Sequence, residues 1–116
     1  MKFYQYPKCS TCVKARKYLE SNAIEHQSIN IVEQAPTVAE LELMLNSYDG
    51  NIRKLFNTSG LQYRELNMKE RLPAMRDVEA IELLASNGML VKRPFLVSGD
   101  QGIVGFKEAD WATFLS

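Results

Sequence analysis

The chain of 116 residues is long enough for one domain with a hydrophobic core and too short for two. Acidic and basic residues balance at a formal net charge of zero, which argues against a polybasic nucleic-acid binder and against an acidic tail. No apolar run approaches the roughly 18 residues of a membrane span, and no apolar segment typical of a signal peptide follows the first residues. We therefore expect a cytoplasmic protein that contacts neither nucleic acid nor membrane directly.

The first part of the chain predicts a β-α-β unit. Residues 2–6 are rich in aromatic side chains and predict a strand, which the proline at position 7 ends. A helical pattern runs from Cys12 to about Asn22. Residues 25–31 alternate loosely and predict a second strand, parallel to the first. The apolar face of the predicted helix carries Cys12, Ala15 and Leu19.

The middle of the chain shows helical patterns only. Thr37 and Glu40 form a capping-box pattern at the start of one helix. Residues 51–57 and 61–67 predict two short helices. Asp77 is expected to cap a further helix that ends near Gly88. The apolar positions expected to face the core in the first and the last of these helices are Leu41, Met44, Leu45, Tyr48, Val78, Ile81, Leu84 and Ala85.

The last part of the chain predicts a hairpin followed by a helix. Phe95–Val97 is expected to be a strand, residues 99–102 a turn, and residues 103–105 the returning strand. Residues 108–115 predict a final helix. The order of elements favours an α/β fold in which helices cover a mixed sheet. The side chains of the last helix expected to face the core are Trp111, Ala112 and Leu115.

The two cysteines, Cys9 and Cys12, are the main candidates for chemistry. A single C-x-x-C supplies too few cysteines for a disulfide framework, and His26 lies in another predicted element, so no metal site is expected. Cys9 falls where a strand ends and a helix begins, and free N–H groups there favour a thiolate and could hold an oxyanion. Cys12 has the spacing to attack a mixed disulfide on Cys9. The alternative is that both are small buried core residues.

Polar and cationic residues near this loop are candidates for binding substrate. Ser10 and Thr11 each offer a hydroxyl group. The Arg93-Pro94 dipeptide predicts a tight turn, with a cis bond as one option, directly before a strand. If that turn lies against the Cys9 loop, the guanidinium of Arg93 stabilises a thiolate or binds an oxyanion. The alternative is a solvated arginine beside Lys92. The other cations considered, each more typical of a surface charge, are Lys8, Lys14, Arg53, Arg64 and Lys107.

Five segments that together span essentially the whole chain carry the motifs of a known family. They are Tyr6-Pro7-Lys8-Cys9-Ser10-Thr11-Cys12, Asn57-Thr58-Ser59-Gly60, residues 63–67, residues 88–94 and Val104-Gly105-Phe106-Lys107. These segments resemble the ArsC-like family, and within it a poorly characterised arsenate-reductase-like branch. The family includes glutaredoxin-coupled arsenate reductases and Spx-type regulators.

This resemblance implies a fold and a set of site residues. The fold would be a thioredoxin-like (glutaredoxin-like) α/β domain over residues 1–116, with a mixed four-stranded sheet, flanking helices and a helical insertion at about residues 33–86. Cys9 would be the nucleophile, and the bond before Pro94 would be cis. Asn57 and Lys107 align near two positions where glutaredoxin-coupled arsenate reductases carry further arginines. Those reductases have no cysteine at the position of Cys12, whereas Spx-type regulators carry the C-x-x-C. The resulting catalytic candidates are Cys9, Cys12 and Arg93, and the substrate-binding candidates are Ser10, Thr11, Asn57, Pro94 and Lys107.

Three functions remain open at this point. The first is an arsenate-reductase-like thiol-disulfide oxidoreductase, in which Cys9 attacks a small oxyanion or a disulfide. Cys12 or an external thiol such as glutathione, glutaredoxin or thioredoxin would resolve the adduct, and no bound cofactor is expected. The second is a redox-sensing regulator of the Spx type, which the resemblance links to RNA polymerase. The third is a thioredoxin-fold binding module with little turnover.

Overall fold

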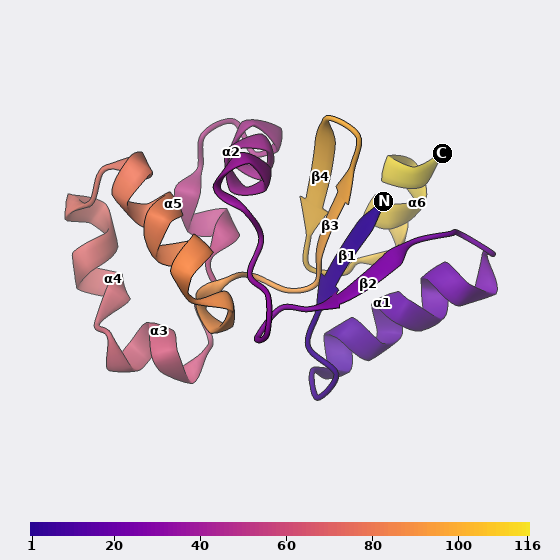
Figure 1. Cartoon of the computed structure of the whole chain (residues 1–116), viewed down its shortest axis with the longest axis horizontal. Helices are drawn as coiled ribbons and strands as arrows, with labels where there is room; N and C mark the ends of the chain where they lie inside the picture. The colour runs from indigo at the N-terminus through magenta and orange to yellow at the C-terminus, as the bar shows by residue number, and fades with distance from the viewer.

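The computed structural model describes residues 1–116, and its centre is a four-stranded mixed sheet between two layers of helices (Figure 1). The strands lie in the order β2-β1-β3-β4. β1 runs parallel to β2 and antiparallel to β3, and β3 runs antiparallel to β4. This confirms the α/β arrangement and the parallel first pair. The strands are β1 (Lys2–Gln5), β2 (Gln27–Asn30), β3 (Phe95–Ser98) and β4 (Gln101–Val104).

The hairpin β3–β4 turns more tightly than the sequence predicted. Ser98 pairs with Gln101, so the turn consists of Gly99 and Asp100 alone. Gly99 has a φ of 61°, a conformation that two-residue hairpin turns require and that glycine adopts without steric cost. The returning strand therefore starts at Gln101, two residues earlier than expected.

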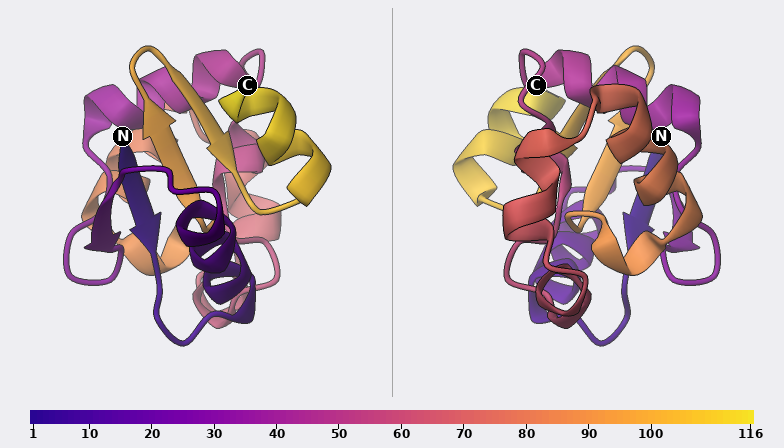
Figure 2. Two further views of the ribbon diagram at one scale, coloured as in Figure 1. Left: turned by 90° about the vertical axis from the view of Figure 1, so that its right-hand side faces the viewer. Right: turned by 90° about the vertical axis from the view of Figure 1, so that its left-hand side faces the viewer.

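One face of the sheet is covered by α1 (Ser10–Ser21) and α6 (Glu108–Leu115), which lie in front of the strands in the left panel of Figure 2. The side chains that alternate onto this face of β1 and β3 are those of Phe3 and Leu96, as the two-residue period of a strand requires. The expected inward face of α1 is confirmed. The buried cluster here consists of Phe3, Ala15, Leu19, Leu96 and Trp111.

The inward face expected for α6 is only partly correct. Trp111 is fully buried, whereas Ala112 is exposed and Leu115 is half-buried. Successive residues of a helix point about 100° apart, so Trp111 and its neighbour cannot both be central to one contact. Leu115 packs against the edge of the cluster as expected, and Phe114 packs there in the place expected for Ala112.

The other face of the sheet is covered by the helical segment between β2 and β3, seen in front in the right panel of Figure 2. Tyr4, Phe95 and Val97 project from the sheet into this larger cluster of 17 buried residues. The helices of the segment are α2 (Val38–Ser47), η1 (Ile52–Leu55), α3 (Leu61–Glu65), α4 (Met68–Arg71), η2 (Leu72–Ala74), α5 (Asp77–Ser86) and η3 (Gly88–Leu90). None of the helices has the length and apolar composition that a membrane span requires.

The predictions for α2 were closer than those for α5. In α2 the core positions are buried or packed against the core, and Thr37 and Glu40 form the expected capping box. In α5 the N-cap is Arg76 and the helix begins at Asp77 itself, one residue earlier than a cap at Asp77 would give, and Val78 is 52% exposed. The buried stripe of α5 is Ala80, Ile81 and Leu84. Val78 points roughly 110° away from the centre of that stripe, which explains the error.

The helix expected over residues 61–67 ends early. α3 stops at Glu65, because Asn67 adopts the left-handed conformation with a φ of 54° and separates α3 from α4. Residues 52–55 form a 3₁₀ turn, where residues 51–57 were expected to form a short helix.

α2 is attached to β4 by side-chain hydrogen bonds along the sheet edge. The hydroxyl of Ser47 accepts a bond from the N–H of Gly102 at 3.2 Å, and the hydroxyl of Tyr48 accepts one from the N–H of Val104 at 3.0 Å. A β carbon at Gly102 would lie 2.5 Å from the terminal methyl of Met44, so any larger residue here would require the Met44 side chain to move. The contact holds the helical segment against the sheet beside the cleft described below.

Candidate active site

Cys9 lies in the loop between β1 and α1 and is the N-cap residue of α1. Its N–H donates to the carbonyl of Tyr6 at 3.0 Å, and its own carbonyl accepts from the N–H of Val13 at 3.0 Å. Because that carbonyl already accepts the first helical hydrogen bond, α1 begins at Ser10, two residues before the predicted start. The thiol of Cys9 is therefore held at the positive end of a helix of 12 residues.

The surroundings of Cys9 favour its thiolate form. Partial burial by itself would raise the pKa of the Cys9 thiol, but the backbone N–H and the thiol of Cys12, together with the guanidinium of Arg93, outweigh it. The pKa of Cys9 therefore lies below that of an ordinary cysteine. Cys9 is half-buried and borders a cleft, so the thiolate can meet a small molecule.

Cys12 has the opposite character. Its side chain is 1% exposed on the inner face of α1, and the N–H of Tyr6 donates to its sulfur at 3.5 Å. Burial raises the pKa of the Cys12 thiol to about 12, and the thiolate of Cys9 contributes further to this rise. Cys12 is thus a neutral hydrogen-bond donor to Cys9 while both thiols are free.

Arg93 lies against the Cys9 loop, not in open solvent. The Arg93-Pro94 peptide is cis, as the resemblance implied. The guanidinium carbon lies 5.2 Å from the ring centre of Tyr6, and Nη1 donates to the carbonyl of Met89 at 3.3 Å. These two contacts hold the guanidinium beside the Cys9 loop, where its charge lowers the pKa of the Cys9 thiol.

A short backbone pairing brings the helical segment to this turn. Phe56 pairs with Val91 in an isolated antiparallel bridge. The N–H of Asn57 donates to Leu90, and the N–H of Lys92 donates to Leu55, each at 2.8 Å. Asn57, which is far from Cys9 in sequence, therefore lies beside the Arg93 turn.

The loop after β4 forms the facing side of the site. The N–H of Gly105 donates to the carbonyl of Pro94 at 2.8 Å, and the indole N–H of Trp111 donates to the carbonyl of Gly105 at 2.9 Å. Gly105 has a φ of 70°, which lets the chain turn at this point. Lys107 follows as the N-cap residue of α6.

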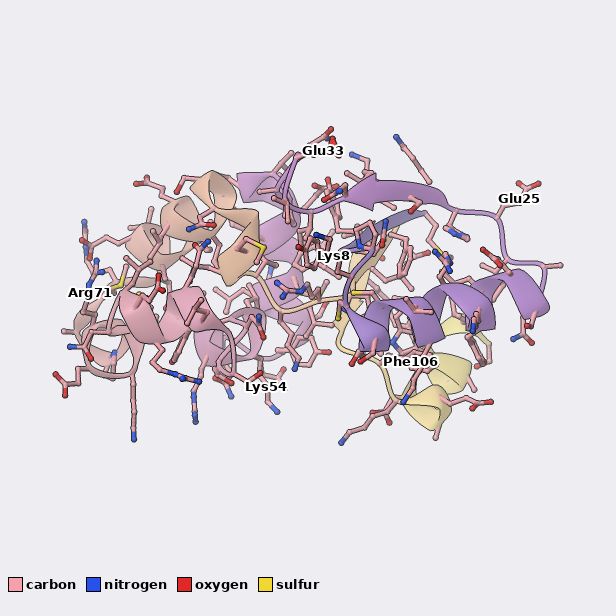
Figure 3. All side chains as sticks on the ribbon, turned by 90° about the horizontal axis from the view of Figure 1, so that it is seen from below. Lys8, Glu25, Glu33, Lys54, Arg71 and Phe106 are labelled. Atoms are coloured by element: carbon pink, nitrogen blue, oxygen red, sulfur yellow. The ribbon has the colours of Figure 1, made fainter.

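These elements enclose a cleft of about 670 Å³. Figure 3 views the molecule from this end, with Lys54 on the helical side and Phe106 on the sheet side. Of the residues proposed from sequence, the structure brings Cys9, Thr11, Asn57, Arg93 and Lys107 to the cleft.

The remaining candidates lie outside the lining of the cleft. Ser10 is exposed on the first turn of α1, and Cys12 and Pro94 are buried behind the cleft wall. Sequence reasoning missed Lys54 and gave Lys92 no role, although both line the cleft. Lys92 could have been noticed as the neighbour of Arg93, whereas Lys54 reaches the site only through the Phe56–Val91 bridge. No three His, Cys, Asp or Glu side chains gather in an arrangement suited to a metal ion.

The mixed sheet, the cysteine pair at the start of α1 and the proline before β3 define a thioredoxin-like protein. The chain belongs to the ArsC family, whose family model matches residues 4–114. It is 51% identical to the uncharacterized protein YusI of Bacillus subtilis, over 91% of this chain and 90% of that one.

Solved structures agree with this assignment. An ArsC family related protein from Bacteroides fragilis has 46% identity and a TM-score of 0.90, covering 97% of this chain and 94% of its own. A possible arsenate reductase from Streptococcus mutans has 38% identity and a TM-score of 0.88, covering 96% of both chains.

Regulators are more distant relatives of this chain. The regulatory protein MgsR of Bacillus subtilis is 28% identical, over 93% of this chain and 84% of MgsR. The global transcriptional regulator Spx of Enterococcus faecalis is also 28% identical, over 97% of this chain and 83% of Spx. The family thus includes both arsenate-reductase-like proteins and regulators.

Proposed function

We propose that this protein is a thiol-disulfide oxidoreductase in which Cys9 is the nucleophile and Cys12 the resolving thiol. The observation that carries the proposal is the contrast between two adjacent sulfurs. The pKa of Cys9 is lowered at the edge of a cleft, whereas the pKa of Cys12 is raised to about 12 in the interior. One sulfur is therefore prepared to attack, and the other stays protonated until the first has reacted.

The first step is attack on a disulfide, R–S–S–R. The thiolate of Cys9 forms a bond to one sulfur, the S–S bond breaks, and R–S⁻ leaves and takes a proton from water. The Arg93 guanidinium stabilises the thiolate before attack and lies where it can stabilise the charge on the departing sulfur.

In the second step Cys12 resolves the mixed disulfide. Once Cys9 is bonded to R–S, it carries no negative charge, and its two contributions to the raised pKa of Cys12 disappear. The hydrogen bond from the N–H of Tyr6 continues to favour the Cys12 thiolate. Cys12 then loses its proton and attacks the sulfur of Cys9, which forms the Cys9–Cys12 disulfide and releases the second R–S⁻.

The two steps convert a protein dithiol and R–S–S–R into a protein disulfide and two molecules of R–SH. An external dithiol protein of the glutaredoxin or thioredoxin kind, or two molecules of glutathione, must return the two electrons. Such reductants keep thiols reduced in the cytoplasm, where we propose that the protein acts.

A small oxyanion is a second candidate substrate. Arsenate would take two electrons from two thiols, giving arsenite, a disulfide and water. The proposal is supported by the cationic groups of Arg93 and Lys107 on the cleft that Cys9 borders, and by the arsenate-reductase-like relative.

A panel of reductase assays tests these proposals. Wild type, Cys9→Ser and Cys12→Ser are supplied with arsenate and with small disulfides, using glutathione, glutaredoxin or thioredoxin as reductant. We expect turnover by wild type, none by Cys9→Ser, and a trapped mixed disulfide in Cys12→Ser, seen by mass spectrometry. Wild type without turnover on any substrate would contradict the enzymatic proposal and favour a binding module.

A redox-sensing regulator that binds RNA polymerase is the second candidate function. MgsR and Spx support it, since regulators share this fold over nearly the whole chain. Pull-down of RNA polymerase from lysate by the oxidised and the reduced protein tests it. Capture that depends on the redox state, and that Cys9→Ser abolishes, would favour regulation. Equal capture, or none, would contradict it.

A further inference from the structure

A second hollow of about 260 Å³ lies beside the cleft and shares two of its lining residues, Lys54 and Lys92. Arg53 also lines this hollow. The cationic lining of the Cys9 cleft therefore continues beyond Arg93 into the helical segment. We call Lys54, Lys92 and the hollow between them the lysine site.

The charges around the cleft and the lysine site are strongly unbalanced. Five cationic side chains line the two cavities, and the only carboxylate among the lining residues is that of Asp110. None of the five cations takes part in a salt bridge. Because the chain as a whole has no net charge, this gathering reflects position and not composition. The five cations are Arg53, Lys54, Lys92, Arg93 and Lys107.

The two lysines are positioned by the backbone. Lys92 is held by its N–H bond to Leu55, and its side chain runs along Gly105, where a β carbon would lie 3.4 Å from its Cε atom. Lys54 lies in η1, directly before the Phe56–Val91 bridge. The bridge thus brings the backbone of both lysines beside the Arg93 turn, and both side chains line the cleft and the hollow next to it.

We propose that the lysine site binds a second anionic group of the substrate, while the reacting sulfur of that substrate meets Cys9. The reaction in this assignment is the thiol-disulfide exchange proposed above, and the assignment rests on that proposed function. The substrate class it defines is a small disulfide that carries a carboxylate a few bonds from the sulfur. Attack by Cys9 on such a disulfide forms a bond to one of its sulfurs, breaks its S–S bond and releases a carboxylate-bearing thiol. Cys12 then releases the second thiol, as in the two steps proposed for R–S–S–R.

The magnitude expected from two lysines is modest. Pairs of opposite charge that are partly exposed to solvent interact weakly, so removal of both amines is expected to change anion selectivity by up to roughly tenfold. The effect should shrink as salt is added, because exposed charges are screened over about 10 Å at 0.1 M ionic strength.

Three disulfides of similar size separate charge from chemistry. They are the anionic 3,3′-dithiodipropionate, the neutral bis(2-hydroxyethyl) disulfide and the cationic cystamine. For each disulfide, we measure the rate at which it oxidises the reduced protein. This rate is divided by the rate at which the same disulfide reacts with free 2-mercaptoethanol, which removes differences in intrinsic reactivity. We expect wild type to prefer the anionic disulfide over the neutral one, and cystamine to be the poorest of the three.

The variants are Lys54→Gln/Lys92→Gln and, as a matched control, Lys17→Gln on the exposed face of α1. The ratio of anionic to neutral rates is expected to fall up to tenfold in the double variant and to stay unchanged in the control. A ratio that is the same in wild type and the double variant would overturn the assignment.

A binding measurement keeps this inference separate from the proposed activity. The thioether 3,3′-thiodipropionate carries the same carboxylates but cannot be reduced. Titration followed by NMR should shift the amides of Lys54 and Lys92, with weaker binding in the double variant than in Lys17→Gln. If no disulfide reacts but this titration behaves as expected, the activity is wrong and the lysine site stands. Equal affinity in wild type and the double variant would overturn the lysine site, whatever the assays show.

Discussion

The two sides of the cleft are built in different ways. The sheet side, with Cys9, Gly105 and Trp111, is anchored in the four-stranded sheet and in the cluster under α1 and α6. The helical side, with Lys54 and Asn57, belongs to short helices and reaches the Arg93 turn through one isolated bridge. The sheet side carries the sulfur chemistry, and the helical side carries cations and amides. Chemistry and substrate choice are therefore supported by separate parts of the structure.

Truncation of Trp111 should have the largest effect on the sheet side. Trp111 is fully buried against Phe3, Tyr18 and Phe106, so Trp111→Ala is expected to lower the free energy of unfolding by about 3–5 kcal/mol. Chemical denaturation measures this loss. Trp111→Phe keeps an aromatic ring but leaves the carbonyl of Gly105 without its donor, which costs about 1–3 kcal/mol. Similar stability of wild type and both variants would show that this side is not rigidly supported.

Removal of the guanidinium at the junction of the two sides should weaken the thiolate. Arg93→Ala is expected to raise the pKa of Cys9 and to slow its reaction with disulfides about ten- to a hundredfold, the equivalent of roughly 1.5–3 kcal/mol for charge-assisted hydrogen bonds. Alkylation rate against pH, measured in a Cys12→Ser background, reports that pKa. Arg93→Lys should restore only part of the effect, since lysine lacks the planar fork. An unchanged titration midpoint in Arg93→Ala would mean that the guanidinium does not act on the sulfur.

The buried thiol should make the reduced protein lose stability at high pH relative to a variant that lacks it, since the lowered pKa of Cys9 acts in the opposite direction in both proteins. Cys12 has a pKa of about 12 when folded and about 8.5 when unfolded, so between these values the unfolded chain releases a proton that the folded protein keeps. Stability is therefore lost as pH rises through this window, by about 1.4 kcal/mol at pH 9.5 relative to pH 7.

Cys12→Ser is the control for this prediction. It lacks the titrating thiol but retains a hydroxyl donor next to Cys9. Denaturation of both proteins under reducing conditions at pH 7 and pH 9.5 gives the difference. Parallel pH profiles would show that Cys12 is not protonated by burial.

A change at the cap of α2 should lower stability without altering the thiol of Cys9. The hydroxyl of Thr37 accepts a hydrogen bond from the N–H of Glu40 at 3.1 Å. Thr37→Ala removes this bond and is expected to lower the free energy of unfolding by about 1 kcal/mol. The alkylation midpoint of Cys9 should not move, because α2 does not contact the Cys9 loop through this cap. A shifted midpoint would show that the two sides of the cleft are coupled.

Much of the sheet and the cysteine loop could be predicted because their signals are local. The aromatic first strand, the capping box at Thr37 and the turn residues before β4 each depend on a few neighbours in sequence. The exact ends of the helices and the orientation of their faces were less predictable. Asn67 ends α3 through a left-handed backbone conformation, and Val78 faces solvent although its spacing matched the core face. Such details depend on which neighbours the helix finally meets.

The sequence by itself determined that Cys9 begins a helix after a strand and that Cys12 follows on its inner face, because strand, helix and i, i+3 spacing are properties of a short segment. Tertiary structure decided what surrounds those sulfurs. Arg93 reaches Cys9 through the pairing of β1 with β3, and Lys54 reaches the cleft through the Phe56–Val91 bridge. These neighbours lie far from Cys9 in sequence, and only the closing of the chain around a shared core brings their charges within range of the thiol.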